Sequence, residues 1–426
     1  MANGTSYMTF TPSGSGTSRR KGTFSAWCKR GDTSTSQRIW GTRNGSGNTT
    51  EVTFNEYIQM YASSGSSEQM NLRTTAKYAD PGAWYHVVVA YDTTQSTEAD
   101  RVKLYVNGVQ NSTFSTYTNY PALNDDLMLG EAYPTSVGAM GDEGSGMWNG
   151  CISHAQYVDG LQLAPTEFGE VDSTSGIWKI KTTAYATPGT NGFFLTMEDR
   201  TNLDLDSSSN AHTFTTTGTL TATYDNPSNN FATPNLLSKG STVVLSNGNT
   251  TIAKDSGWLS CMGTFGMDAS KWYWEQKVAA VGNANAGITM SKQDGTSHSA
   301  VDATRIMYGS DGNAYNGQGS TTATGTTFTT GDIISVALDC AGDTVKFYKN
   351  NVLIHTETES VISDNEWSPA WGMSSGTWDT NFGNGYFGTT AVTSAEADDA
   401  GIGAFEYAPP TGYYALCTKN IKAYGG

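Results

Sequence analysis

Charged residues are scarce in this 426-residue sequence, and basic residues are the scarcer kind. Only 15% of the residues are Asp, Glu, Lys or Arg, against roughly 25% in an average soluble domain. With 24 basic and 40 acidic residues, the formal net charge is −16. A nucleic acid needs a basic surface to hold its phosphates, and so does an anionic membrane. We therefore expect neither nucleic acid nor membrane among the partners.

Cysteine and histidine are also rare, with five residues of each. The cysteines are odd in number and scattered without a CxxC pair, which argues against a structural zinc site and a disulfide framework. We expect five free thiols in a protein assembled in a reducing cytoplasm. The histidines lack metal-ligand spacing, and HExxH, GxSxG and P-loop motifs are missing. We expect no enzymatic activity, and no cofactor apart from the Ca²⁺ considered below.

Long apolar runs are missing as well. The longest, such as residues 87–91, are far too short for a transmembrane helix. Residues 1–7 contain neither the basic nor the apolar region of a signal peptide. We therefore expect a protein that does not use the general export route and that reaches the outside of a cell only by lysis.

What the sequence has instead is glycine, at 48 residues, and one pattern that occurs twice. Residues 102–110 and 345–353 both follow Val-Lys-apolar-Tyr-x-Asn-x-Val. The alternation predicts a strand, and the Asn-Gly pair at 107–108 and the Asn-Asn pair at 350–351 suit a type I′ hairpin turn. An apolar strand pattern precedes each copy. Two unrelated hairpins could converge by chance, but we favour two related β-sandwich domains in tandem.

Longer motifs resemble two known domain families. The first 170 residues resemble the laminin-G-like, or concanavalin-A-like, jelly-roll domain in three stretches: aromatic-Ser-x-Trp-x-Lys at 24–29, the Trp-x-His strand and hairpin at 84–108, and the closing motif at 148–167. The second half resembles the SPRY, or B30.2-like, domain through Lys-x-Tyr-x-Glu at 271–275, the Gly-Asp strand at 331–339 and Asn-Phe-Gly at 381–383.

These resemblances imply an all-β protein of two tandem concanavalin-A-like antiparallel β-sandwiches, or jelly rolls. We place the first sandwich at residues 1–170 and a short β-rich connector at 171–240. The SPRY-like sandwich and a C-terminal tail then occupy residues 241–426.

The connector and the tail narrow the resemblance further. The tail motif Pro-Pro-x-Gly…Ala-Leu-Cys-Thr-x-Asn at 409–420, and motifs within 157–170 and 191–233, are similar to those of tailed-bacteriophage proteins, often marine ones. This implies a virion structural protein, such as a tail fibre, a receptor-binding protein or another appendage that binds host glycan or protein through sandwich loops. It also implies other virion proteins as partners, a homo-oligomer, and a location in the virion.

Two other functions stay open. The sequence has no heptad or triple-β-helix shaft, which keeps a purely structural capsid decoration or tail adaptor as an alternative. A glycan-active enzyme is more remote. One endoglucanase family with this fold uses Glu-x-Asp-x-x-Glu, whose outer carboxylates act as nucleophile and acid. The nearest match begins at Glu170 and Asp172, but Ser175 stands where the third carboxylate would be.

A glycan site needs exposed aromatic rings to stack on sugars, with amides and carboxylates beside them for the hydroxyl groups. Polar loops present such groups at Tyr315 and Asn316, at Trp378 and Asp379, and at Tyr133 in the first domain. We predict these five residues as ligand-binding. The alternative is that each ring packs against a neighbouring loop, and a protein contact competes with a sugar.

A Ca²⁺ site is a further candidate, because the resemblance to laminin-G-like sandwiches implies one at a rim of the first domain. Carboxylates and carbonyl oxygens are the ligands that Ca²⁺ prefers. Asp125 and Asp126 form one candidate pair, and Asp142 and Glu143 form another, both in predicted loops. The alternative is that these are solvated acidic loops.

Overall fold

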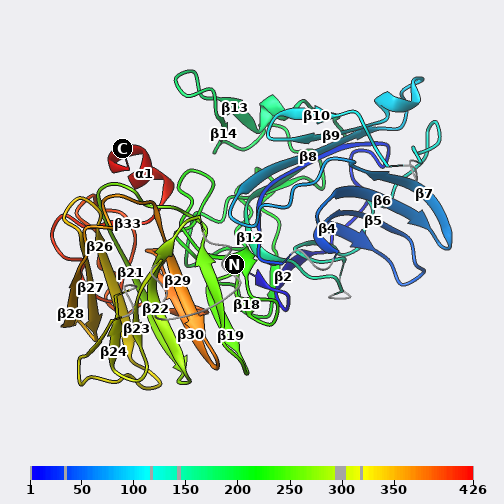
Figure 1. Ribbon diagram of the computed structural model, residues 1–426. Helices are drawn as coiled ribbons and strands as arrows, with labels where there is room; N and C mark the ends of the chain where they lie inside the picture. Colours follow the sequence, from blue (N-terminus) through cyan, green and yellow to red (C-terminus); the bar gives the residue numbers. More distant parts are fainter. Residues whose placement is uncertain are drawn as a thin grey trace. The chain divides into compact units, whose positions relative to one another are not determined.

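A computed structural model describes residues 2–32, 36–115, 119–141, 145–292, 304–316 and 320–425. The protein is all-β, as predicted: within these ranges the helical elements are α1 (Thr418–Tyr424) and the 3₁₀ turns η1 (Glu98–Asp100) and η2 (Pro165–Glu167). No helix in the described ranges is long and apolar enough to cross a membrane. The chain forms two compact units, Met1–Ala222 and Thr223–Gly426, so the connector is divided between them (Figure 1).

The first unit contains two main antiparallel sheets. The first hairpin sheet has the order β1 (Ala2–Asn3), β12 (Asn149–Asp159), β3 (Lys21–Arg30), β8 (Trp84–Asp92), β9 (Val102–Val106) and β10 (Val109–Asn111), with β15 (Phe193–Leu195) on β12. The first facing sheet has the order β16 (Thr215–Thr217), β2 (Tyr7–Phe10), β11 (Thr135–Val137), β4 (Gln37–Arg43), β5 (Thr49–Phe54), β6 (Ile58–Ser64) and β7 (Ser67–Arg73). A separate hairpin joins β13 (Gly169–Val171) to β14 (Trp178–Ile180).

The second unit repeats this plan. Its hairpin sheet has the order β18 (Val244–Ser246), β19 (Thr251–Lys254), β30 (Gly376–Asn381), β21 (Lys271–Ala280), β26 (Ile333–Asp339), β27 (Thr344–Lys349) and β28 (Val352–Thr358), with β33 (Tyr414–Ala415) on β21. Its facing sheet has the order β17 (Pro234–Lys239), β20 (Leu259–Gly263), β29 (Trp367–Met373), β22 (Ala284–Met290), β23 (Arg305–Gly309), β24 (Asn313–Tyr315) and β25 (Thr321–Ala323). A small hairpin joins β31 (Tyr386–Phe387) to β32 (Thr390–Ala391).

Each unit has its own apolar core between its two sheets. In the first, Phe24 of β3 stacks on Trp40 of β4, with ring centroids 4.5 Å apart. In the second, Tyr308 of β23 meets Phe347 of β27 at 5.7 Å. Fully burying one such side chain contributes about 1.5–3 kcal/mol. All five cysteines are buried and free, as predicted.

Both predicted hairpin turns are confirmed. Asn107 and Gly108 have φ angles of 50° and 79°, and Asn350 and Asn351 have 48° and 68°. Positive φ at both central residues is what a type I′ turn requires. The turns join β9 to β10 and β27 to β28, in the strand orders β12-β3-β8-β9-β10 and β30-β21-β26-β27-β28. The repeated sequence pattern therefore occupies equivalent strands of the two units.

The same asparagine braces each turn in the same way. The Asn107 N–H donates to the His86 carbonyl at 2.9 Å, and the His86 N–H donates to Asn107 Oδ1 at 2.8 Å. Asn350 makes the same two bonds with Ile333, at 2.9 and 2.8 Å. His86 and Ile333 are therefore equivalent positions on β8 and β26.

The chain that follows β12 in the first unit and β30 in the second returns over the outer face of the hairpin sheet. In the first unit, residues 160–186, here the first strap, bring Phe168 against Val88 of β8. In the second, residues 395–417, here the second strap, bring Phe405 against Tyr273 of β21 at 5.1 Å. Each hairpin sheet therefore packs on both of its faces.

Candidate functional site

Trp378 is a core residue, and the expectation that a loop presents its ring is wrong. It lies within β30, where it pairs with Ile252 of β19 and Val278 of β21, and it is 1% exposed. Strands on both sides of β30 turn this Gly-rich segment into the middle of a sheet. The neighbouring Asp379 faces the other way, accepts a hydrogen bond from the Thr251 hydroxyl at 2.5 Å, and has a pKa raised by burial.

The other three predicted ligand-binding residues do not meet at one place. Tyr315 lies on the outer face of the second facing sheet, and its hydroxyl donates to Asp311 Oδ2 at 2.5 Å. The Asn316 amide donates to Glu359 Oε1 at 3.0 Å. Tyr133 is in the first unit, in a loop before β11, and its side chain is 37% exposed. Tyr315 is therefore on the outside of the facing sheet, whereas Trp378 is in the core on the hairpin sheet.

The predicted Ca²⁺ ligands are only partly described. Asp125 accepts a hydrogen bond from a glutamine side chain at 3.1 Å, and Asp126 pairs with Arg20 at 2.8 Å. Asp142 and Glu143 lie outside the described residues. Among the residues that the structure does describe, no three His, Cys, Asp or Glu side chains come together as a metal site would require. The Ca²⁺ site stays a prediction.

The carboxylates of the glycosidase-like motif lie on the β13–β14 hairpin. Lys179 Nζ is 3.2 Å from Glu170 Oε1 and 3.5 Å from Asp172 Oδ2. Hydrogen bonds from the Ser175 backbone and hydroxyl, and from Thr174, lower the pKa of Asp172 to about 2. A general acid needs a raised pKa instead. This arrangement suits turn stabilisation better than acid catalysis.

His86 contacts a serine but has the wrong tautomer to activate it. Trp178 Nε1, which can only donate, lies 2.9 Å from His86 Nδ1, so Nδ1 is the acceptor. The neutral ring then carries its proton on Nε2, which donates to Ser25 Oγ at 2.8 Å. Burial lowers the pKa of His86 to about 3, and the side chain is fully buried. This contact therefore holds the first strap on the sheet.

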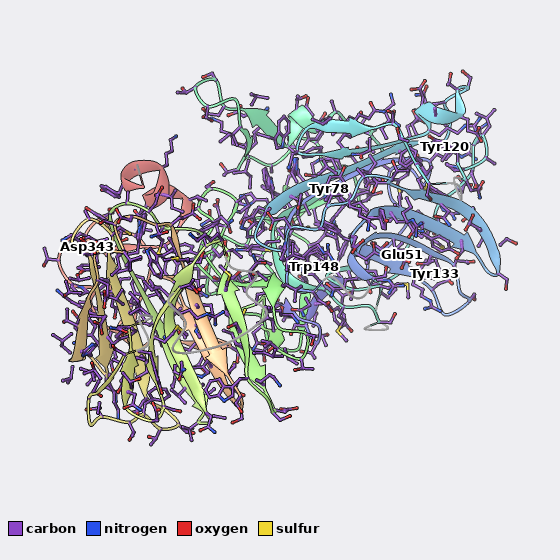
Figure 2. All side chains as sticks on the ribbon, viewed as in Figure 1. Glu51, Tyr78, Tyr120, Tyr133, Trp148 and Asp343 are labelled. Carbon is purple, nitrogen blue, oxygen red and sulfur yellow. The ribbon has the colours of Figure 1, made fainter. Side chains whose placement is uncertain are left out.

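The outer side of the first facing sheet carries an ordered set of polar side chains, here called the polar face: Glu51 of β5, Gln59 and Tyr61 of β6, and Asn71 and Arg73 of β7. The intervening residues of all three strands are in the core, so these point away from it. Glu51 pairs with Tyr61, which pairs with Asn71, and Gln59 pairs with Arg73. Figure 2 labels Glu51 over this sheet. Five polar or aromatic groups from three strands thus share one side of the sheet, and Glu51 is the one of them that is buried, at 6% exposed.

Hydrogen bonds fix most of these groups in position. The Gln59 amide donates to Asn71 Oδ1 at 2.7 Å, and the Asn71 amide donates to Glu68 Oε2 at 2.9 Å. Glu51 is paired with Arg38 at 3.0 Å. Tyr61 is half-buried, and its hydroxyl has no hydrogen-bond partner within the described residues. Polar side chains held in fixed positions around the Tyr61 hydroxyl suit a ligand that carries hydroxyl groups.

Two cations converge on one ring at the edge of the polar face. The guanidinium of Arg73 is 5.0 Å from the ring centre of Tyr57, and Lys77 Nζ is 5.5 Å from it. Lys77 also pairs with Glu56 at 2.6 Å, which lowers the pKa of Glu56 and raises that of Lys77. The carboxylate of Glu56 is therefore paired with Lys77.

A second exposed surface lies at one end of the second sandwich, in loops 255–258, 281–283 and 374–375. Strand β19 pairs with β30 just before the first loop, and β20 pairs with β29 just after it. A backbone bond of 2.8 Å ties residue 374 to residue 283. Trp258 is 45% exposed and Val281 is 49% exposed. We call this the loop end; its apolar groups suit a protein contact.

Neither the polar face nor Trp258 lies in the Gly-rich loops from which the ligand-binding residues were predicted. The alternation of residues 49–64 could have placed Gln59 and Tyr61 on one outward face. Their partners on β5 and β7 depend on strand register, which that alternation leaves open. Trp258 follows a short Asp-Ser-Gly stretch, which is a local signal of the same kind as the one that precedes Tyr315.

Comparisons with known proteins identify the two domains. Residues 2–166 match the family described as "Concanavalin A-like lectin/glucanases superfamily", and residues 271–385 match the family described as "SPRY domain". A search of curated proteins found no match.

Solved structures similar to this chain include three SPRY domains. The SPRY domain of human HERC1 has 19% identity and a TM-score of 0.28 over 32% of this chain and 91% of that one. The TRIM65 PSpry domain has 13% identity and a TM-score of 0.31 over 35% and 89%. A human SPRY domain has 14% identity and a TM-score of 0.27 over 33% and 94%.

Proposed function

We propose that this chain, in which a concanavalin A-like domain is followed by a SPRY domain, is a non-catalytic protein that binds a saccharide on the polar face of its first unit. The observation that carries the proposal is the row of Glu51, Tyr61 and Asn71 across three adjacent strands. The half-buried Tyr61 ring offers a stacking surface with the Asn71 amide beside it, while the Glu51 carboxylate on its other side is buried and paired with Arg38.

We further propose that the protein works as a component of a tailed-phage virion, in attachment to the host. The support is the resemblance of its connector and tail to such proteins, and the tail motif has a structural role. The Asn420 amide donates to Asp398 Oδ2 at 2.7 Å and to the Ala415 carbonyl at 2.9 Å. One stacked ring contributes about 1 kcal/mol, so many copies on a particle, each a homo-oligomer, would provide the avidity.

The test compares Tyr61→Ala with Tyr133→Ala on a glycan array and in adsorption of particles to host cells. Both residues are tyrosines of the first unit, and Tyr133 is the more exposed. We expect Tyr61→Ala to abolish detectable binding and Tyr133→Ala to leave it intact, with both variants folded by circular dichroism. Equal binding by the two variants would place the site elsewhere.

The loop end favours a second candidate function, a structural capsid decoration or tail adaptor. Trp258 and Val281 are apolar and exposed at one end of the second sandwich, and aromatic anchors are typical of protein interfaces. Electron microscopy of the intact particle distinguishes the two functions. In a purely structural protein the polar face would be covered by a neighbouring subunit, whereas attachment needs it free.

A further inference from the structure

We infer that the polar face binds an acidic saccharide, with Arg73 paired to a carboxylate of the sugar; this rests on the proposed saccharide binding. Arg73 projects from β7 beside Gln59 and is half-buried. Its planar guanidinium has five N–H donors and matches the two oxygens of a carboxylate.

The positive charge of Arg73 is not compensated by the residues that the structure describes. Lys77 and Arg73 both lie over Tyr57, but the nearby carboxylate of Glu56 pairs with Lys77, at 2.6 Å. No carboxylate of the described residues lies within ion-pair distance of Arg73. In a chain of net charge −16, a partly exposed guanidinium without a carboxylate partner among the described residues is a feature that favours an anionic ligand.

The remaining charges make the two ends of the polar face different, with a cation at the Arg73 end and a carboxylate at the Glu68 end. Glu51 is neutralised by Arg38 at 3.0 Å. Glu68 accepts amide hydrogen bonds from Asn71 and Asn119 at 2.9 and 3.3 Å. It pairs with Ser63 of β6, at the opposite end of β7 from Arg73. A carboxylate near Glu68 would be repelled, whereas sugar hydroxyls could donate to it.

The middle of the face then receives the uncharged part of the ligand. Tyr61 lies between Glu51 and Asn71, and its ring can stack on a sugar while its hydroxyl accepts or donates one bond. The Gln59–Asn71 bond of 2.7 Å holds both amides before any ligand arrives. Pre-set groups of this kind reduce the entropy lost on binding. The acidic group thus lies over Arg73, and neutral hydroxyls extend towards Glu68.

The experiment measures binding of the full chain to polygalacturonate and hyaluronan, to the methyl-esterified form of each, and to dextran. Methyl esterification removes the charge and keeps the sugar backbone. We expect the acidic forms to bind about tenfold more tightly than their esters, with a preference that weakens as salt is added. Arg73→Gln should abolish this preference, Arg73→Lys should restore part of it, and Lys422→Gln, which removes one exposed cation elsewhere, should leave it unchanged.

The outcomes separate this inference from the proposed function. If the neutral forms bind equally well or more tightly, the inference of an acidic ligand is wrong. If Tyr61→Ala then abolishes binding of the neutral forms, the proposal of a saccharide site on the polar face still holds. An acid preference that survives Arg73→Gln, or that ignores salt, also overturns the inference. Binding of no polysaccharide by the wild type contradicts both proposals.

Discussion

Ser25 of β3 and Glu275 of β21 occupy equivalent places in the two sandwiches, but they bury different chemistry. His86 and Ile333 are the residues that bind the turn asparagines, and they pair with Trp27 and Lys277 respectively. Ser25 and Glu275 each lie two residues before these strand partners. In both units this position lies under the strap that returns over the hairpin sheet.

The first unit fills the position with neutral groups. His86 donates to Ser25 Oγ at 2.8 Å and accepts from Trp178 of the first strap at 2.9 Å. The Trp178 ring lies against Gly108 of the hairpin turn, where a Cβ atom would come within 2.6 Å of it. The strap, the sheet and the turn thus meet at one imidazole.

The second unit fills the same position with an acid. Glu275 is fully buried and accepts the N–H groups of Glu406 and Tyr407 in the second strap, both at 2.8 Å. The Tyr273 hydroxyl donates to it at 3.1 Å and the Asn381 amide at 3.4 Å. Burial raises its pKa to about 7 despite these donors. One topology therefore anchors its strap by either a neutral or an ionisable group.

The largest expected effect is an opposite response of the two units to pH. The pKa of His86 is lowered to about 3, so its contribution is complete above the ordinary value of about 6.5 and is lost as pH falls from there towards 3. The pKa of Glu275 is raised to about 7, so its contribution is complete below about 4.5 and is lost as pH rises towards 7. Each change amounts to a few kcal/mol.

Hydrogen exchange of peptides from residues 84–92 and 271–280, corrected for intrinsic exchange rates, measures the stability of each unit between pH 5 and 8. The first peptide should be better protected at pH 8, and the second at pH 5. His86→Asn and Glu275→Gln should each flatten the response of their own unit alone. Parallel responses of both units would contradict the assignment.

Removal of the buried groups should cost the second unit more than the first. Glu275→Ala leaves two backbone N–H groups and the Tyr273 hydroxyl without their acceptor, and we expect a loss of roughly 3 kcal/mol. Ser25→Ala leaves only the His86 N–H unpaired, for roughly 1–2 kcal/mol. Urea denaturation followed at each unit gives both values, and a larger loss for Ser25→Ala would refute the comparison.

The turn asparagines share two backbone bonds and should behave alike in these; the Asn350 amide also donates to Asp332 Oδ1 at 2.8 Å. Asn107→Ala and Asn350→Ala each remove a bond to a strand N–H and leave alanine at a positive φ, and we expect about 1–2 kcal/mol from each. Asn107→Gly and Asn350→Gly are the controls, since glycine tolerates the φ angle and loses only the side-chain hydrogen bonds. Because Asn350 makes one bond more, Asn350→Ala should cost up to about 1 kcal/mol more than Asn107→Ala, and a larger difference would show that the hairpins are not equivalent.

The smallest effect concerns the strap contact that only the first unit makes. Trp178→Phe keeps an aromatic ring against the turn and removes the N–H that reaches His86 Nδ1. We expect about 1 kcal/mol, measured by urea denaturation. Protection of residues 160–186 should fall while the second unit is unaffected. No change at all would mean that stacking alone holds the strap.

The hairpins were predictable in detail because their determinants are local. An Asn-Gly or Asn-Asn pair between alternating residues leaves few turns other than type I′. The all-β class and the two tandem domains followed from motifs that each span a few residues. The polar face was not predictable, because Tyr61 gains its neighbours Glu51 and Asn71 only through the register of three strands.

The sequence by itself determined the strands, the turns and the two sandwich domains of this protein, since alternation and positive φ angles are properties of adjacent residues. Only the tertiary structure decided which aromatic rings are buried. Trp378 is in the core because strands more than 90 residues away in sequence, around Ile252 and Val278, lie on both sides of it. Trp258 stays exposed because it lies in the loop just before β20, outside the sheet. Burial depends on distant partners, and no local pattern specifies them.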